Sequence, residues 1–348
     1  MELDPAVLAS LHLSADQTWA TTSSGRGSSS ASTVKISSIA SNGSEITFFH
    51  EDLVGCECIS ISARCEFESL QAISAAVPNL CPRSLGIGTY TSSPSTHFIV
   101  TQFLRLYEPR FPFLAGVYDS IVSRRPDLAA KLARLHTTPA PVPEGFKTAQ
   151  FGFPVTTCCG DTLQDNSFKS SWATFFAENR LKHILQQCKT NQGVDLVIRQ
   201  MIEDVVATVV PRLLGDDHLG NGKGVTPVVV HGDLWYGNVG RSNVPNEPPH
   251  DVIFDPSACY AHNEYELGIM RMFGGFSRSF FSEYHALCPK TEPVREYEDR
   301  LKLYELYHHL NHYAIFGPMK KYTFLSYTYR DGSIVIMRDL LRKYGQGR

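Results

Sequence analysis

The sequence lacks the features of secreted, membrane and nucleic-acid-binding proteins. No apolar run approaches the length of a membrane span, and the start, MELDPAVLAS, lacks the basic-then-apolar pattern of a secretory signal. There is no dense block of Lys and Arg, and the formal charge is −3, so nothing in the sequence matches a phosphate backbone. We therefore expect a cytoplasmic protein that acts on a small molecule and binds neither nucleic acid nor membrane. The sequence leaves the oligomeric state open.

The cysteines show no metal-binding pattern. There are nine, an odd number, and they are scattered. Cys56 and Cys58 are one residue apart and Cys158 and Cys159 are adjacent, but neither pair has the spacing of a zinc knuckle. We predict that the cysteines are small buried apolar residues. Whether Cys158 and Cys159 respond to oxidation is not decided by the sequence.

The length and the residue patterns predict two lobes. At 348 residues the chain exceeds the size at which one hydrophobic core stops growing, and 43% hydrophobic and 19% charged residues are typical of a folded domain. Residues 1–104 have the pattern of a small α+β lobe, with a short leading helix, strands in TVKIS, EITFF and THFIVTQFL, and a helix over residues 62–76. Residues 105–348 are mostly helical. LRLYEPRFP, with its two prolines, marks the boundary.

In the second lobe, the segment TPVVVHGDLWYGNVG contains the residue types that phosphoryl transfer requires. A β-branched run leads to His231 and Gly232, Asp233 and Asn238 are five residues apart, and Asp255 follows the strand-like VIF. A carboxylate must orient the attacking hydroxyl and accept its proton, and oxygen ligands must hold Mg²⁺ against the phosphates. We predict Asp233 as the base, Asn238 and Asp255 as the metal ligands, and His231 as a structural residue.

These segments resemble those of the fructosamine kinase family. The resemblance rests on HGDLWYGNVG, VIFDPSACYAHNEYELGIMRMFGGFSRSFFSEYH, RLKLYELYHHLNHYAIFG, FGFPVTTCCGDTLQ and SWATFFAENRLKHIL, and covers most of residues 128–344. It implies a two-lobed fold of the protein-kinase and aminoglycoside-phosphotransferase type, with a β-rich N-lobe and a helical C-lobe. It also implies ATP with Mg²⁺ and the phosphorylation of a sugar hydroxyl on a ketosamine.

The resemblance implies roles for further residues of the second lobe. Trp235 is expected to form a wall of the acceptor pocket. Glu266 is expected to anchor residues 231–238, called the catalytic loop below, rather than to take part in the reaction. His309 and His312, in the aromatic helix from Tyr304 to Phe316, either line the acceptor side or belong to the core.

The first lobe departs from the family pattern at the nucleotide lysine. Kinases of this kind carry a lysine on the third strand, paired with a helix glutamate. The segment here reads TFFH, which places His50 at the lysine position, and Glu66 matches the glutamate. Gln102 and Leu104 are additional candidates for nucleotide contacts.

Three explanations fit the missing lysine. Lys35, on the preceding strand, binds the nucleotide phosphates in place of the missing lysine, or it is an ordinary exposed lysine. Alternatively, the protein is a pseudokinase or binding protein, or the fold serves other chemistry. The Ser/Gly-rich stretch with Arg26, residues 21–32, is either a phosphate-covering loop or a disordered linker.

Overall fold

The computed structural model describes residues 3–22, 31–54, 57–106, 126–242, 249–318 and 328–345. Contacts group the chain into two units, one of residues 1–111 and 239–256, the other of residues 112–238 and 257–348. Most of the Ser/Gly-rich stretch, Arg26 included, and the segment LRLYEPRFP from residue 107 lie outside the described residues. No described helix is long and apolar enough to cross a membrane.

The first unit contains a five-stranded antiparallel sheet with the order β1-β2-β3-β5-β4. Its strands are β1 (Thr18–Thr22), β2 (Ala31–Ile39), β3 (Glu45–Val54), β4 (Ser84–Thr89) and β5 (Thr96–Gln102). The predicted strands in TVKIS, EITFF and THFIVTQFL are confirmed. The register places Lys35 opposite Phe49 and Thr33 opposite Glu51. Because paired residues share a face and neighbours alternate, Lys35 and Glu51 lie on one face and His50 on the other.

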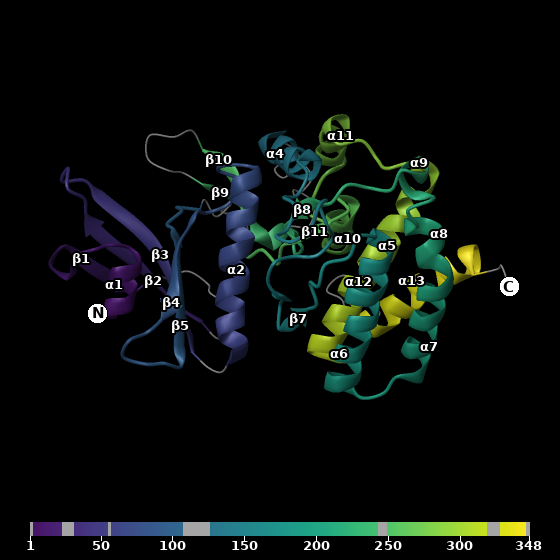
Figure 1. The fold of residues 1–348 in the computed structure, drawn as a ribbon, viewed down its shortest axis with the longest axis horizontal. Helices are drawn as coiled ribbons and strands as arrows, with labels where there is room; N and C mark the ends of the chain where they lie inside the picture. Colours follow the sequence, from purple (N-terminus) through teal and green to yellow (C-terminus); the bar gives the residue numbers. More distant parts are fainter. Residues whose placement is uncertain are drawn as a thin grey trace, which may run out of the picture. The chain divides into compact units, whose positions relative to one another are not determined.

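Two helices cover the opposite faces of this sheet (Figure 1). On one side is α1 (Pro5–Ser10), whose Val7 packs with Ile36, Phe98 and Val100. Asp4 caps this helix by accepting from the backbone of Ala6, and also accepts from the backbone of Thr91 and Ser92, which fastens the helix to the strand connection. On the other side is α2 (Glu57–Ala76), which confirms and extends the predicted helix over residues 62–76.

A hairpin from the second half of the sequence belongs to the first unit. It consists of β9 (Val239–Ser242) and β10 (His250–Ile253). Ser242 forms a β-bridge with Leu106, and Ile253 N donates to Leu80 O at 2.8 Å. The sequence assigned every residue after 104 to the second lobe. Asp255, which follows this hairpin, instead groups with the first unit, because backbone hydrogen bonds of long sequence separation tie the hairpin there.

The second unit is mainly helical (Figure 1). Two long helical stretches, residues 172–192 and 196–214, each contain a π-helical segment. The other helices are α4 (Pro126–Thr137), α9 (Leu219–Gly222), α10 (Glu264–Phe273), α11 (Arg278–Leu287), α12 (Tyr297–Phe316) and α13 (Tyr329–Tyr344). The short strands are β6 (Thr157–Cys159), β7 (Thr162–Gln164), β8 (Val228–Val230) and β11 (Cys259–Ala261). Gly274 and Gly275, which both have positive φ angles, separate α10 from α11.

Trp172 lies in the aromatic core of the second unit. It is fully buried and donates from Nε1 to Tyr304 Oη at 2.9 Å. Next to this core, Arg300 and Glu264 form a buried ion pair, with Nε to Oε2 at 2.7 Å and Nη2 to Oε1 at 3.1 Å. This pair joins α12 to the start of α10. Glu266, also on α10, binds the backbone of residues 231 and 232.

Candidate active site

The catalytic loop leaves the end of β8 through a backbone conformation that only glycine tolerates. Gly232 has a φ of 82°, and a Cβ atom there would lie 2.1 Å from Ser257 O. Ser257 N in turn donates to His231 O at 2.8 Å. This close approach of two backbone segments is the physical reason for the glycine before Asp233.

Glu266, on α10, binds the backbone of this loop. Its carboxylate accepts from the backbone N–H groups of His231 and Gly232, the latter at 3.0 Å. Burial would raise the pKa of Glu266, but the nearby His136, whose Nε2 lies 3.7 Å from Oε2, together with His231 lowers it. Glu266 is therefore ionised when it binds the loop, which confirms the predicted anchor.

His231 has the predicted structural role. Its Nδ1 accepts from the backbone N–H of Asp233 at 3.2 Å, and its side chain is fully buried. This bond orients the loop immediately before the proposed base.

Asp233 and Asn238 lie side by side within the second unit. Asn238 Nδ2 donates to Asp233 O at 2.9 Å and lies 3.4 Å from Oδ2. The short helix η4 (Tyr236–Asn238) turns the chain back and so brings Asn238 to Asp233. Because the amide nitrogen is used in this bond, the amide oxygen of Asn238 is the atom suited to a metal ion.

Three further residues from distant segments lie beside Asp233. Cys159 Sγ is 3.9 Å from Asp233 Oδ1. Asn311, on α12, donates from Nδ2 to Cys159 O at 3.1 Å and to Sγ at 3.3 Å. The ligand atoms of Cys159, Asp233 and His308 all lie within 4.8 Å of one another. Burial lowers the pKa of His308 well below its usual value, so its ring is neutral.

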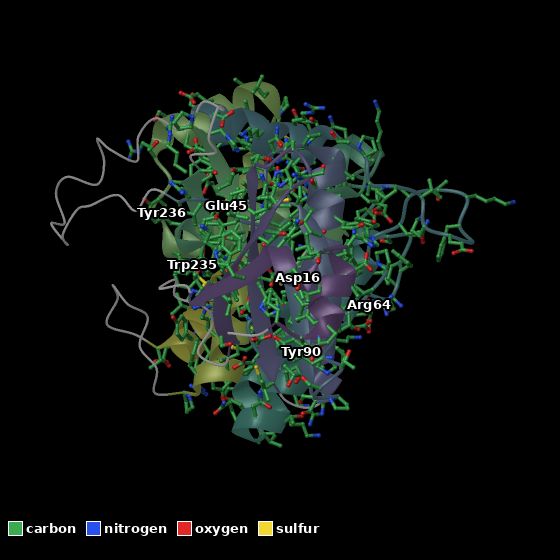
Figure 2. The ribbon with its side chains drawn as sticks, turned by 90° about the vertical axis from the view of Figure 1, so that its left-hand side faces the viewer. Asp16, Glu45, Arg64, Tyr90, Trp235 and Tyr236 are labelled. Atoms are coloured by element: carbon green, nitrogen blue, oxygen red, sulfur yellow. The ribbon has the colours of Figure 1, made fainter. Side chains whose placement is uncertain are left out.

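Trp235 begins a line of aromatic side chains. Its ring, 40% exposed, lies 5.7 Å from that of Phe273, and Phe273 lies 5.2 Å from His312 (ring centroids). Figure 2 shows Trp235 with its neighbour Tyr236. Tyr329, on α13, follows 4.9 Å from His312. The structure thus brings together two predicted acceptor residues, Trp235 and His312, through Phe273.

His309 differs from the expectation for an acceptor residue. Its side chain is 2% exposed, and Nε2 lies 3.5 Å from Glu305 Oε1. The ring also contacts that of Tyr329 at 6.1 Å. His309 therefore belongs to the core alternative for this helix, because its side chain is almost completely buried.

In the first unit, the structure corrects the residue at the lysine position. His50 is completely buried on the α1 face of the sheet, with its ring 5.9 Å from Phe98 and Nε2 3.4 Å from Asp52 Oδ1. Burial lowers its pKa despite Asp52, so the ring is neutral. Tyr90, labelled in Figure 2, stacks on the same ring at 6.2 Å. His50 therefore does not point toward Glu66.

Glu51, one residue further along β3, takes that place. Burial, with smaller contributions from the carboxylates of Asp255 and Asp52, raises the pKa of Glu51 to about 7. Burial, Asp255 and Glu51 likewise raise the pKa of Glu66. Burial also raises the pKa of Asp255. Three carboxyl groups, those of Glu51, Glu66 and Asp255, thus lie near one another in the first unit. Strand neighbours face opposite sides, so His50 and Glu51 cannot both face Glu66.

The other predicted nucleotide residues lie on or just after the sheet of the first unit. Lys35 shares the face of Glu51, and its Nζ lies 3.7 Å from Glu45 Oε1 and 5.4 Å from the ring of Phe103. Gln102 ends β5 and pairs with Arg83 through its backbone N–H at 2.8 Å. Leu104 follows two residues later and is half-buried.

The residues of the catalytic loop fall within the sequence model of a known protein family. The sequence model described as "Fructosamine kinase" matches residues 60–327, which include Glu66, the catalytic loop and α12. The chain belongs to the fructosamine kinase family. The match begins well before residue 128, where the motif-based resemblance began.

Two relatives agree with this assignment, and one solved structure shares the fold. Mouse ketosamine-3-kinase is 38% identical over 55% of this chain and 54% of its own length, so the chain spans about half of that relative. A candidate ketoamine kinase from Synechocystis is 35% identical over 71% of each chain. The crystal structure of a candidate fructosamine-3-kinase from Thermobifida fusca aligns with a TM-score of 0.67 at 19% identity, covering 92% of this chain and 93% of that one. The predicted kinase-like α+β fold is confirmed.

Sequence reasoning about this fructosamine kinase family member missed three residues of interest. Phe273 contacts both Trp235 and His312. The sequence signal that could have identified it is the FGG of residues 273–275, at the end of α10. Glu51 lay next to the residue that was chosen. Cys159 was interpreted only as a buried apolar residue, and its sequence separation of 74 residues from Asp233 hid the contact.

Proposed function

We propose that this protein is an ATP-dependent kinase that phosphorylates a hydroxyl group of a sugar amine, a ketosamine. The observation that carries the proposal is the position of Asp233, at the end of a loop whose backbone is held by Glu266, in a chain of this family. Names of relatives that refer to ketosamine and ketoamine substrates support the acceptor class. The predicted cytoplasmic location remains a prediction.

Asp233 is the proposed base. Its backbone is fixed by His231 on one side and by Asn238 on the other, so its carboxylate orientation is set before substrate binds. A positioned carboxylate orients the acceptor hydroxyl and receives its proton as the bond to the γ-phosphorus forms. Positioning and charge stabilisation account for most of catalysis in such transfers.

Asn238 and Asp255 are the proposed Mg²⁺ ligands. Both offer hard oxygen atoms, which Mg²⁺ prefers, and it needs few of them because phosphates and water complete its shell. Asn238 has its nitrogen engaged with Asp233, which leaves the oxygen as the ligand atom. Burial raises the pKa of Asp255, and a metal ion bound there would favour its charged form. When bound, the metal neutralises charge on the transferring phosphates.

The acceptor is proposed to contact the aromatic line that contains Trp235 and His312. Trp235 is 40% exposed, a large apolar surface to leave in water beside the base. Aromatic faces bind the apolar faces of sugars and attract ammonium groups, and a ketosamine contains both. His309, being buried, is proposed to support α12 and not to touch the acceptor.

Lys35 is proposed as the cation that replaces the missing lysine. It lies on the same sheet face as Glu51, whereas His50 lies on the other face. Glu66, Gln102 and Leu104 remain proposed nucleotide residues. Lys35→Met is expected to weaken ATP binding at least about tenfold, as the loss of one charge-assisted bond implies, while His50→Gln leaves it unchanged. Equal effects of the two changes would contradict this role.

The test is a kinase assay with purified protein, Mg-ATP and a small ketosamine. Formation of ADP and a mass gain of one phosphoryl group on the sugar are expected. Binding is checked separately by thermal shift, because ATP that binds only the folded state raises the midpoint of unfolding. Absence of both the shift and the product, at millimolar nucleotide, would refute the proposed function.

A further inference from the structure

A second donor set surrounds the proposed base and has a different chemistry from a magnesium site. Cys159 contributes a sulfur atom, His308 a ring nitrogen and Asp233 a carboxylate oxygen, all within 4.8 Å of one another. Cys159 and His308 are each 1% exposed, while Asp233 is half-buried. All three lie in the second unit, so the set is formed by a single compact body.

The spacing of these atoms suits a tetrahedral transition-metal ion. Zinc bonds to sulfur at about 2.3 Å and to nitrogen or oxygen at about 2.0–2.2 Å, so its ligands lie roughly 3.3–3.8 Å apart. The sulfur-to-oxygen distance of 3.9 Å between Cys159 and Asp233 is close to that range. Mixed sulfur, nitrogen and oxygen ligands select Zn²⁺ and its neighbours, and Mg²⁺ disfavours them.

Two features of the surroundings point to a ligand at this place. His308 Nδ1 is buried and has no hydrogen-bond partner among the described residues, a cost that an ion bound at this nitrogen would remove. Asn311 donates from Nδ2 to Cys159 Sγ at 3.3 Å, which is the outer hydrogen bond that supports a metal-bound thiolate. Asn311 and His308 come from the same helix, α12, so one element positions both.

We propose that Cys159, His308 and Asp233 form an inhibitory site for Zn²⁺ or a similar thiophilic divalent ion. Binding displaces the thiol proton of Cys159 to solvent and uses one oxygen of Asp233 as a ligand. Water takes the fourth position. A metal-bound Asp233 cannot accept the proton of an acceptor hydroxyl, so the ion blocks transfer without competing for the Mg²⁺ ligands. The inhibitory effect, unlike the binding, rests on the proposed function.

Binding is tested first with Co²⁺, which reports its ligands by absorption and requires no kinase activity. The full-length protein titrated with Co²⁺ is expected to show a thiolate-to-cobalt charge-transfer band and the strong visible bands of tetrahedral cobalt, both displaced by Zn²⁺. Cys159→Ser is expected to remove the charge-transfer band. His308→Gln is expected to weaken Zn²⁺ binding at least about 100-fold, since even the outer partners of metal ligands are worth about 10–100-fold.

Cys158→Ala is the matched control, because its thiol neighbours Cys159 in sequence but is not in the cluster. It is expected to keep the full spectrum. Absence of a charge-transfer band in the unmodified protein, or a band that persists in Cys159→Ser and is lost in Cys158→Ala, would overturn the site. If kinase activity is found, Zn²⁺ in the presence of excess Mg²⁺ should abolish it and a chelator should restore it. Activity unchanged by saturating Zn²⁺ would overturn the inhibition but not the proposed function.

Discussion

Glu51→Gln is expected to stabilise this protein at pH 8 and to leave it nearly unchanged at pH 4.5. Glu51 lies on β3 near the carboxyl groups of Glu66 and Asp255, and its pKa is raised to about 7 from an ordinary value of 4.5. An acid with a raised pKa in the folded state binds more protons there than in the unfolded chain. Stability is therefore lost as the pH rises from 4.5 to 7, and stays low above it.

The magnitude follows from the pKa of Glu51. One pKa unit corresponds to about 1.4 kcal/mol, so the rise from 4.5 to about 7 sets an upper limit of about 3.5 kcal/mol. Glu51 is only partly buried and shares its repulsion with two other carboxyl groups, so solvent screening reduces the effect. We expect a gain of roughly 1–2 kcal/mol in the free energy of unfolding at pH 8. Glutamine keeps the shape and removes the charge.

The assay is urea denaturation of both proteins at several pH values between 4.5 and 8, without metal or nucleotide. Glu45→Gln is the matched control, because Glu45 lies on the same strand with its side chain 49% exposed beside Lys35. Its surface ion pair is worth at most about 1 kcal/mol. A Glu51→Gln protein that is no more stable at pH 8 than the parent, or one stabilised equally at every pH, would refute the clustering of these carboxyl groups.

Three other substitutions test the second unit. Asp233→Asn should lower the turnover number about 10²–10⁴-fold, as loss of a positioned base does, while the ATP-induced thermal shift persists; an active variant would exclude Asp233 as the base. Glu266→Gln should cost about 1–3 kcal/mol in urea denaturation, because two buried N–H groups lose a charged acceptor, and an unchanged midpoint would contradict the anchor. Arg300→Met should cost about 3–5 kcal/mol, since it leaves Glu264 buried and unpaired, unlike exposed Arg295→Met, which should be neutral.

Sequence alone was sufficient for the parts of this protein that depend on nearby residues. The strand-like segments specified β2, β3 and β5, and helical periodicity specified α1 and α2. The order of His231, Gly232, Asp233 and Asn238 identified the catalytic loop, because a glycine-dependent turn and a five-residue spacing are local properties.

Tertiary structure decided what depends on which face a side chain takes and on distant contacts. His50 and Glu51 are neighbours, and only strand pairing shows that the second one faces Glu66. His309 and His312 share a helix, yet packing buries the first and leaves the second beside Phe273. Cys159 lies beside Asp233 although 74 residues separate them in the sequence. Asn311 on α12 binds the backbone of Cys159 and so fixes the position of β6. The sequence therefore determined the inventory of the site, and packing determined which of these groups can act together.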